Sequence, residues 1–295
     1  MLSRKVQGPS RRDDLGLLGP EIINPSWRLI PLQTCNPFLN MAVDELLFRN
    51  RCDYSIEPMQ TIRFYRWKPS AVSIGRHQEL HNEVDIEACN KLGISVVRRI
   101  SGGGAVFHMF EGEVTYSVVG DFQSLRTTTS TQVYQRILSA LSLGLQKLGV
   151  LPAIGEMGCP AVFVGRKKIS GNAQAVSGNV FLQHGTFLVD YDPHLMYTVL
   201  KARPNQLRTK MVQSVYSRVT TLRSEAISTD FDFLTSILTE AFKEEFQIPA
   251  TDFIISPLTQ EEIEQAERLA RTRYKSPLWT EMQEETELLP TVAGK

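Results

Sequence analysis

The chain has 295 residues, of which 42% are hydrophobic and 22% are charged, so it is long and apolar enough to fold as a large globular domain and general disorder is excluded. Its 32 basic and 32 acidic residues cancel to a formal net charge of zero, which argues against a nucleic-acid binder that relies on a broad basic field. No apolar run approaches the roughly 20 residues that span a bilayer, and the first 20 residues lack the apolar core of a secretory signal, so neither a membrane partner nor secretion is expected.

The first half of the chain alternates strand-like and helical segments. Asn36 or Asn40 can cap a helix whose apolar residues recur over 38–47, and a second helix follows Asn82 and ends at Gly93. Alternating or β-branched segments predict strands at 27–31, 61–67, 71–74, 94–98, 105–108 and 113–119.

The second half places hairpins between helices. Polar residues at 127–131 open an amphipathic helix that extends to residue 148, and apolar stripes over 231–242 and 263–270 predict two more helices. Glycine turns join strand-like segments at 161–164, 168–176, 180–182 and 186–189. This order predicts an α+β fold with a mixed, mainly antiparallel sheet flanked by helices, rather than a doubly wound parallel sheet.

The cysteines indicate the compartment. Cys35, Cys52, Cys89 and Cys159 form no C-x-x-C pair and have no regular spacing, so the sequence predicts no disulfide framework and no metal ligands. A reducing cytoplasm follows, or an organellar matrix if the chain is eukaryotic.

Residues 98–108, Arg-Arg-Ile-Ser-Gly-Gly-Gly-Ala-Val-Phe-His, are the most informative stretch. Three consecutive glycines between strands let the backbone approach a ligand closely and aim several N–H groups at an anion. Arg98 and Arg99 add positive charge for a phosphate or a carboxylate. The competing interpretation is a plain strand connection with surface arginines, and the spacing fits neither a P-loop nor a Rossmann fingerprint.

Two later segments are further candidates. Residues 165–174, Gly-Arg-Lys-Lys-Ile-Ser-Gly-Asn-Ala-Gln, place a lysine beside small residues, where it can polarise a carbonyl or neutralise an acyl phosphate. From spacing alone a solvated basic turn is the more common outcome. His184-Gly185 can leave room for a ligand at a strand, although a lone histidine is more often structural.

In this order the three segments resemble motifs of the lipoate-protein ligase and octanoyltransferase family, within the biotin/lipoate protein ligase superfamily. "NMAVDELL" at Asn40–Leu47, "SIGRHQ" at Ser73–Gln78 and "LARTRYKSPLW" at Leu269–Trp279 also resemble segments of that family. The resemblance covers roughly Trp27 to Leu222 and implies the α+β catalytic domain of these enzymes. The parts we expect are a flexible segment over 1–24, a catalytic domain over 25–247, a helical extension over 248–282 and a flexible tail over 283–295.

The resemblance also implies roles for residues. Lys168 matches the family's essential lysine, which would hold the acyl carbonyl oxygen and the bridging phosphate or thioester while an acceptor lysine attacks. The implied substrate-binding residues are Arg99, Ser101, Gly102, Gly103, Gly104, His108, Ser170, Gly171, His184 and Gly185. Apolar neighbours would bury the aliphatic tail, each CH₂ contributing about 0.8 kcal/mol.

The sequence departs from many ligases of the family at two places. They continue after the histidine with Asp-x-Gly-Asn, whereas Met109 follows His108 here, and they carry an Asn-Asp pair where this chain has Cys159-Pro160. Cysteine-dependent octanoyltransferases of the superfamily carry their acyl group as a thioester on a cysteine upstream of the lysine motif. Cys159 lies nine residues before Lys168 in a similar context, and a nearby lysine would activate its thiol; a packed structural cysteine is the alternative.

We therefore expect an enzyme that attaches a lipoyl or octanoyl group to apo lipoyl domains of 2-oxoacid dehydrogenases or to the glycine-cleavage H protein. The favoured hypothesis is a lipoate-protein ligase that uses ATP and Mg²⁺ and could require a separate accessory subunit. The alternative is a Cys159-dependent octanoyltransferase that takes its acyl group from acyl carrier protein and needs no cofactor. A biotin-protein ligase is disfavoured because its glycine loop differs, and a non-catalytic binder of lipoyl domains or lipoate would show binding without turnover.

Overall fold

The computed structural model describes residues 26–53, 59–155, 160–201 and 218–282. Three predictions, the flexible ends over 1–24 and 283–295 and the role of Cys159, concern residues outside these ranges. The strands are β1 (Trp27–Cys35), β2 (Gln60–Trp67), β3 (Ala71–Ile74), β4 (Ser95–Arg98), β5 (Val106–His108), β6 (Glu113–Asp121), β7 (Pro152–Ile154), β8 (Ala161–Val164), β9 (Lys167–Ser177), β10 (Val180–Leu188) and β11 (Phe253–Ile255). The helices are α1 (Pro37–Cys52), α2 (Leu80–Glu83), α3 (Ile86–Lys91), α4 (Ser130–Lys147), α5 (Pro193–Val199), α7 (Phe231–Phe246), α8 (Gln260–Leu269) and α9 (Pro277–Thr280), with 3-10 turns at Gln123–Leu125 and Ala250–Asp252 and a π-helical turn at Ala270–Tyr274.

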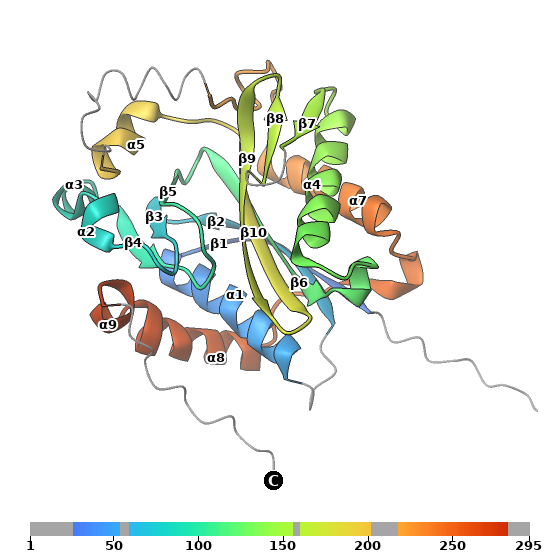
Figure 1. Ribbon diagram of the computed structural model, residues 1–295, viewed down its shortest axis with the longest axis horizontal. Coiled ribbons are helices and arrows are strands. Elements are labelled where there is room, and N and C mark those ends of the chain that lie inside the picture. The colour runs from blue at the N-terminus through green and yellow to red at the C-terminus, as the bar shows by residue number, and fades with distance from the viewer. Residues whose placement is uncertain (1–25, 54–58, 156–159, 202–217, 283–295) are drawn as a thin grey trace, which may run out of the picture.

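The main sheet has the strand order β11-β1-β2-β6-β10-β9-β8-β7, and a small sheet, β4-β3-β5, lies beside it (Figure 1). In the main sheet β1 pairs in parallel with β11 and with β2, and every other pairing is antiparallel. The prediction of an α+β fold with a mixed, mainly antiparallel sheet is confirmed.

Local side chains explain where several helices begin. Asn36 is the cap of α1, because its side chain accepts a hydrogen bond from the Leu39 amide at 3.0 Å, whereas Asn40 lies buried inside the helix. The helix predicted after Asn82 is interrupted, and Asp85 caps a separate helix, α3, by accepting from the Ala88 amide at 2.9 Å. The two strand segments predicted on either side of His184 form one continuous strand, β10, since both neighbouring strands pair with it across that gap.

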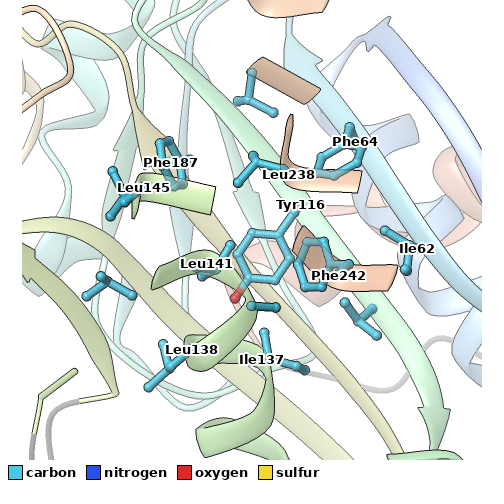
Figure 2. Packing of buried hydrophobic residues seen from close by; sticks show 14 of the residues in the cluster. Ile62, Phe64, Tyr116, Ile137, Leu138, Leu141, Leu145, Phe187, Leu238 and Phe242 are labelled. Carbon is cyan, nitrogen blue, oxygen red and sulfur yellow. The ribbon is translucent and has the colours of Figure 1, made fainter. Parts of the chain in front are cut away.

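Helices α4 and α7 cover one face of the main sheet (Figures 1 and 2). Figure 2 shows Tyr116 of the sheet between Leu141 of α4 and Phe242 of α7, and Phe64 beside α7; Phe242 contacts both rings. The apolar stripes predicted for these helices point inward, so this cluster buries them completely at Leu141 and Leu238.

Helix α1 and the C-terminal helices cover the other face. Tyr274 donates a hydrogen bond to Glu45 of α1 at 2.5 Å, and the Trp279 indole donates to the Arg98 carbonyl at 2.9 Å. Residues after 247 therefore do more than extend the chain: they add β11 to the main sheet and pack against the strand that leads into the glycine segment. In the part of the chain that the structure describes, no helix combines the length and the apolar character needed to cross a membrane.

Candidate active site

A cavity of about 310 Å³ lies between the two sheets, α1 and α5. Its apolar wall includes Met41, Tyr65, Trp67, Phe107, Leu188 and Met196. Eight of the predicted site residues line it: Arg99, Gly103, Gly104, His108, Lys168, Gly171, His184 and Gly185. Segments that are 60 or more residues apart in the sequence thus meet around a space with an apolar interior, which suits an aliphatic chain.

The glycine loop is held by a close backbone contact. Gly103 has φ +91°, a backbone conformation that residues with a side chain rarely adopt. A Cβ on Gly75 would collide with the Gly103 backbone. The Arg76 amide donates to the Ser101 carbonyl at 2.9 Å, which fixes the start of the loop. The glycines are therefore required by the fold of the loop as well as by access to a ligand.

Arg99 organises this loop from inside. Its guanidinium donates to the Gly102 and Gly104 carbonyls at 2.7 and 2.8 Å, and to the hydroxyls of Ser101 and Ser73, both at 3.1 Å. Burial lowers the pKa of Arg99 to about 10, so the group stays charged at neutral pH. Ser101 and Gly102 do not themselves line the cavity and shape it through Arg99.

Arg98, the other arginine of this segment, points elsewhere. It is fully buried, and its guanidinium donates to the carbonyls of Thr280 and Gln78, both at 2.7 Å. Both arginines were predicted to add positive charge for a bound phosphate or carboxylate, but only Arg99 lines the cavity. Arg98 joins the C-terminal helix to the strand beneath the glycine loop.

Lys168 lies next to an irregularity in β9. The pairing with β8 leaves Ile169 as an extra residue between Lys168 and Ser170, a bulge of the kind that re-aims neighbouring side chains. The lysine side chain crosses directly over Gly171, where a Cβ would stand 2.6 Å from both its Cε and its Nζ atoms. Gly171 is therefore the residue that lets Lys168 lie along the cavity wall; Ser170 is buried and does not line the cavity.

Asp44 is a central residue that the sequence did not single out. It extends from α1 over three neighbouring strands and accepts hydrogen bonds from Arg63 (2.8 Å), Tyr65 (2.8 Å), Ser117 (2.9 Å) and His184 (3.0 Å). Burial opposes ionisation of the carboxyl, but the hydrogen bond from His184 and the charge of Arg63 outweigh it and hold its pKa below the ordinary value. Its only sequence signal is an acidic residue inside an apolar helical segment.

Two histidine–carboxylate pairs are linked to Arg99 through serine hydroxyls. His184 bonds Asp44 through Nδ1 and the Ser101 hydroxyl through Nε2, the latter at 2.6 Å. Burial lowers the pKa of His184, against the opposing effect of Asp44, so its neutral form is favoured.

His108 makes the same kind of contacts, with a carboxylate through Nδ1 and a serine hydroxyl through Nε2. Its Nδ1 contacts Glu113 at 2.6 Å, its Nε2 contacts the Ser73 hydroxyl at 2.8 Å, and its ring stacks on Trp67 with 3.9 Å between centroids. Through Ser73 and Ser101 the two pairs form one continuous network around Arg99, which fixes the guanidinium and hence the glycine loop.

Replacing Asp44 with alanine should lower the free energy of unfolding by about 3–5 kcal/mol, because it leaves Arg63 buried without its carboxylate. Chemical denaturation of the purified variant measures this change. The matched control is Glu87→Ala, which breaks the exposed pair with Lys91 and should cost less than about 1 kcal/mol. Equal losses in the two variants would contradict the role given to the Asp44 network.

The depressed pKa of His184 predicts a pH dependence of stability. In the unfolded chain His184 takes up its proton near its ordinary pKa of 6.5, whereas in the folded protein it resists protonation to lower pH. The unfolded state thus binds more protons below about pH 6.5, and stability falls as the pH drops. We expect His184→Gln to show a smaller loss of unfolding free energy than the wild type between about pH 7 and about pH 5; the same loss in both would show that His184 does not titrate in this way.

The side chain of Asn172 connects the cavity to the residue after Cys159. It lines the cavity, donates to the Pro160 carbonyl at 3.0 Å and accepts from the Tyr116 hydroxyl. Gly185 on the neighbouring strand leaves room for this amide, because a Cβ there would overlap it. Pro160 follows Cys159 in the sequence, and Cys159 itself lies outside the described residues.

Comparison with known proteins places this chain among enzymes of protein lipoylation. A family model described as the lipoyl protein ligase A/B catalytic domain matches residues 36–243. Octanoyltransferase LipM of Brevibacillus brevis is 32% identical over 276 residues, which cover 86% of this chain and 98% of the relative. LipM of Geobacillus kaustophilus is 32% identical over 277 residues, covering 86% and 97% of the two chains.

Solved structures of ligases share the fold. The bi-partite lipoate protein ligase of Thermoplasma acidophilum, from an archaeal lipoylation system, superposes with a TM-score of 0.76 at 27% identity, over 90% of this chain and all of the other. A crystal structure of lipoate-protein ligase A bound with ATP gives a TM-score of 0.72 at 26% identity, over 87% and 98% of the two chains. The similarity thus extends well beyond the motifs around the cavity.

Proposed function

The chain belongs to the lipoyl protein ligase A/B catalytic domain family, and from this we propose that it is an octanoyltransferase, which moves an octanoyl group from acyl carrier protein to a lysine of an apo lipoyl domain. The observation that carries the proposal is the similarity, over nearly the whole length of the relatives, to proteins named octanoyltransferase LipM. This favours the alternative of the sequence analysis over the ligase hypothesis.

In the first step that we propose, the octanoyl tail enters the cavity and the Cys159 thiolate attacks the thioester carbonyl of the donor. A bond forms between sulfur and the carbonyl carbon, the carbon–sulfur bond to the carrier breaks, and the carrier leaves as a thiol with the proton that Cys159 gave up. Lys168 lines the cavity and stabilises the negative charge that develops on the carbonyl oxygen. Asn172 holds the Pro160 carbonyl and so fixes the backbone beside the nucleophile.

In the second step the neutral amine of the acceptor lysine attacks the Cys159 thioester. An amide bond forms, the enzyme's carbon–sulfur bond breaks, and the proton lost by the amine returns to the thiol. The oxyanion forms again at the same carbonyl carbon, so Lys168 serves both steps. The glycine loop, fixed by Arg99, closes the wall beside the acyl chain.

A lipoate-protein ligase remains the second candidate, because the ATP-bound ligase structure shares this fold over most of both chains. Its reaction would need ATP and Mg²⁺, and Mg²⁺ is usually held through carboxylates and phosphate oxygens. Among the described residues that line the cavity, Glu113 is the one carboxylate, and its Oε1 atom is already bonded to His108 and Thr115. This lining fits a Mg²⁺ site poorly, which disfavours the ligase reaction at this cavity.

Intact mass of an apo lipoyl domain separates the two candidates. The domain is incubated with the enzyme and either octanoyl-carrier protein alone or lipoate with ATP and Mg²⁺. An octanoyl increment from the carrier protein without ATP is the expected result. A lipoyl increment that requires ATP, with none from the carrier, would establish the ligase instead, and binding without either increment would indicate a non-catalytic relative.

A further inference from the structure

Basic residues are concentrated in two segments of a chain whose total formal net charge is zero. Residues 165–168 read Gly-Arg-Lys-Lys, and the stretch from Lys201 to Arg223 contains six lysines and arginines and no acidic residue, against a net charge of zero for all 295 residues. Residues 202–217 of this stretch lie outside the described ranges. The local excess of positive charge contrasts with the balanced charge of the whole sequence.

The fold brings Lys167 and Lys168 next to Arg218 and Val219 beside the cavity. The Lys168 amide donates to the Arg218 carbonyl at 2.7 Å, and Lys168 pairs with Val219 in parallel. Lys168 and Val219 line the cavity, whereas their neighbours Lys167 and Arg218 are exposed. Successive residues of extended chain face opposite sides, so these two charges lie outside the cavity but only one residue from its wall.

This basic surface is formed by Arg166, Lys167 and Arg218, whose side chains are all exposed. Within the described ranges no ion pair joins any of the three to a carboxylate. Of the carboxylates in the same region, Asp190 is paired with Arg223 at 2.6 Å, whereas Glu225 accepts a hydrogen bond from the Thr220 hydroxyl at 2.5 Å and keeps its single negative charge against the three positive ones. The surface therefore presents net positive charge to a partner.

We propose that Arg166, Lys167 and Arg218 form the docking surface for the acidic face of the acyl carrier protein that donates the octanoyl group. The inference rests on the proposed function and adds the place where the donor binds. A carrier delivers its acyl group on a flexible arm, so its body must bind next to the entrance while the tail enters the cavity. Complementary charge at that point speeds encounter and orients the carrier, at little cost in stability.

The test variant is Lys167→Glu with Arg218→Glu, and the matched control is Arg268→Glu with Arg271→Glu. The control pair lies on exposed positions of the C-terminal helical region, on the other side of the molecule in Figure 1, and changes the net charge equally. Transfer to a lipoyl domain is measured with octanoyl-carrier protein and with a small uncharged octanoyl thioester. Each assay is repeated at low and high salt.

With the carrier protein as donor we expect the test variant to lose about tenfold or more in kcat/KM, mainly through KM, and to lose most of the salt dependence of the wild type. With the small thioester both variants should match the wild type, which shows that the test variant is folded and that its catalytic groups work. Unchanged kinetics with the carrier would overturn the proposal, and so would a rise in KM for the lipoyl domain alone, which would assign the surface to the acceptor. If the wild type takes no octanoyl group from the carrier at all, the proposed function fails and this inference fails with it.

Discussion

Replacing Lys168 with alanine is expected to lower kcat/KM for octanoyl transfer by about 10²–10³-fold or more, with the fold intact. The lysine lines the cavity beside the apolar wall, where a positive charge stabilises an oxyanion far better than it would in water. The side chain lies at the cavity wall rather than in the hydrophobic core, so the fold should tolerate its removal. Transfer is measured by the intact mass of the lipoyl domain, and the fold by circular dichroism.

Two further variants make this prediction specific to the position of the charge. Gly171→Ala keeps the lysine but places a Cβ 2.6 Å from its Cε and Nζ atoms, so the ammonium must move and transfer should fall as well. Lys91→Ala removes an exposed lysine on α3 and should leave transfer unchanged. Normal transfer by Lys168→Ala, with a normal spectrum, would remove Lys168 from the site.

Replacing Cys159 with alanine should abolish transfer from octanoyl-carrier protein, because no other group in the proposed reaction can carry the acyl thioester. The same change should be harmless if the protein is a ligase, since a ligase needs no acyl-cysteine. Initial rates of octanoylation of the lipoyl domain measure the effect directly.

Other cysteines of the chain serve as controls for this variant. Cys35→Ala and Cys52→Ala alter half-buried thiols away from the cavity lining and should retain transfer. Burial raises the pKa of Cys52, which keeps that thiol protonated and unreactive at neutral pH. Full activity of Cys159→Ala with the carrier protein would contradict the thioester mechanism.

The sequence predicted the fold class well because its apolar patterns are long and strongly periodic. The apolar stripes of α4 and α7 specify both the helices and the faces that they bury, and the β-branched and aromatic residues of β2 and β6 specify buried strands. Short or irregular pieces carried too little pattern: β7 and β11 have three residues each, and α9 has four. Gly185 was also misleading, because a glycine at that position predicted a break between two strands. Pairing with β6 and β9 on either side keeps β10 continuous there.

Part of the site could be predicted because its motifs are local in sequence. The buried carboxylates that hold the motif residues in place come from distant or unrelated segments and could not be predicted. The glycine loop, Lys168 and His184 fall within short recognisable segments. Asp44 and Glu113 acquire their roles only when α1 and β6 come next to the two histidines, 140 and 5 residues away in the chain. The one sequence feature that marks Asp44 and Glu113 is an acidic residue within an apolar segment. A buried carboxylate needs hydrogen-bond or charged partners, and no local sequence pattern reveals which residues these are.

The C-terminal segment gives a second example. Its motif around Trp279 resembled a family segment, yet its role follows from contacts with Arg98, 181 residues earlier. That arginine directly precedes Arg99, so the C-terminal helices and the acyl cavity are joined through two consecutive residues. The predicted boundary between a catalytic domain ending at residue 247 and a helical extension over 248–282 stays a prediction.

The intact mass of the enzyme itself, after incubation with octanoyl-carrier protein and no acceptor, tests the central claim most directly. The account predicts that the wild type gains one octanoyl group that hydroxylamine removes, that Cys159→Ala gains none, and that adding an apo lipoyl domain transfers the group to it. An enzyme that stays unmodified while the lipoyl domain becomes octanoylated would contradict the thioester mechanism, and modification of the domain only with lipoate and ATP would contradict the proposed function.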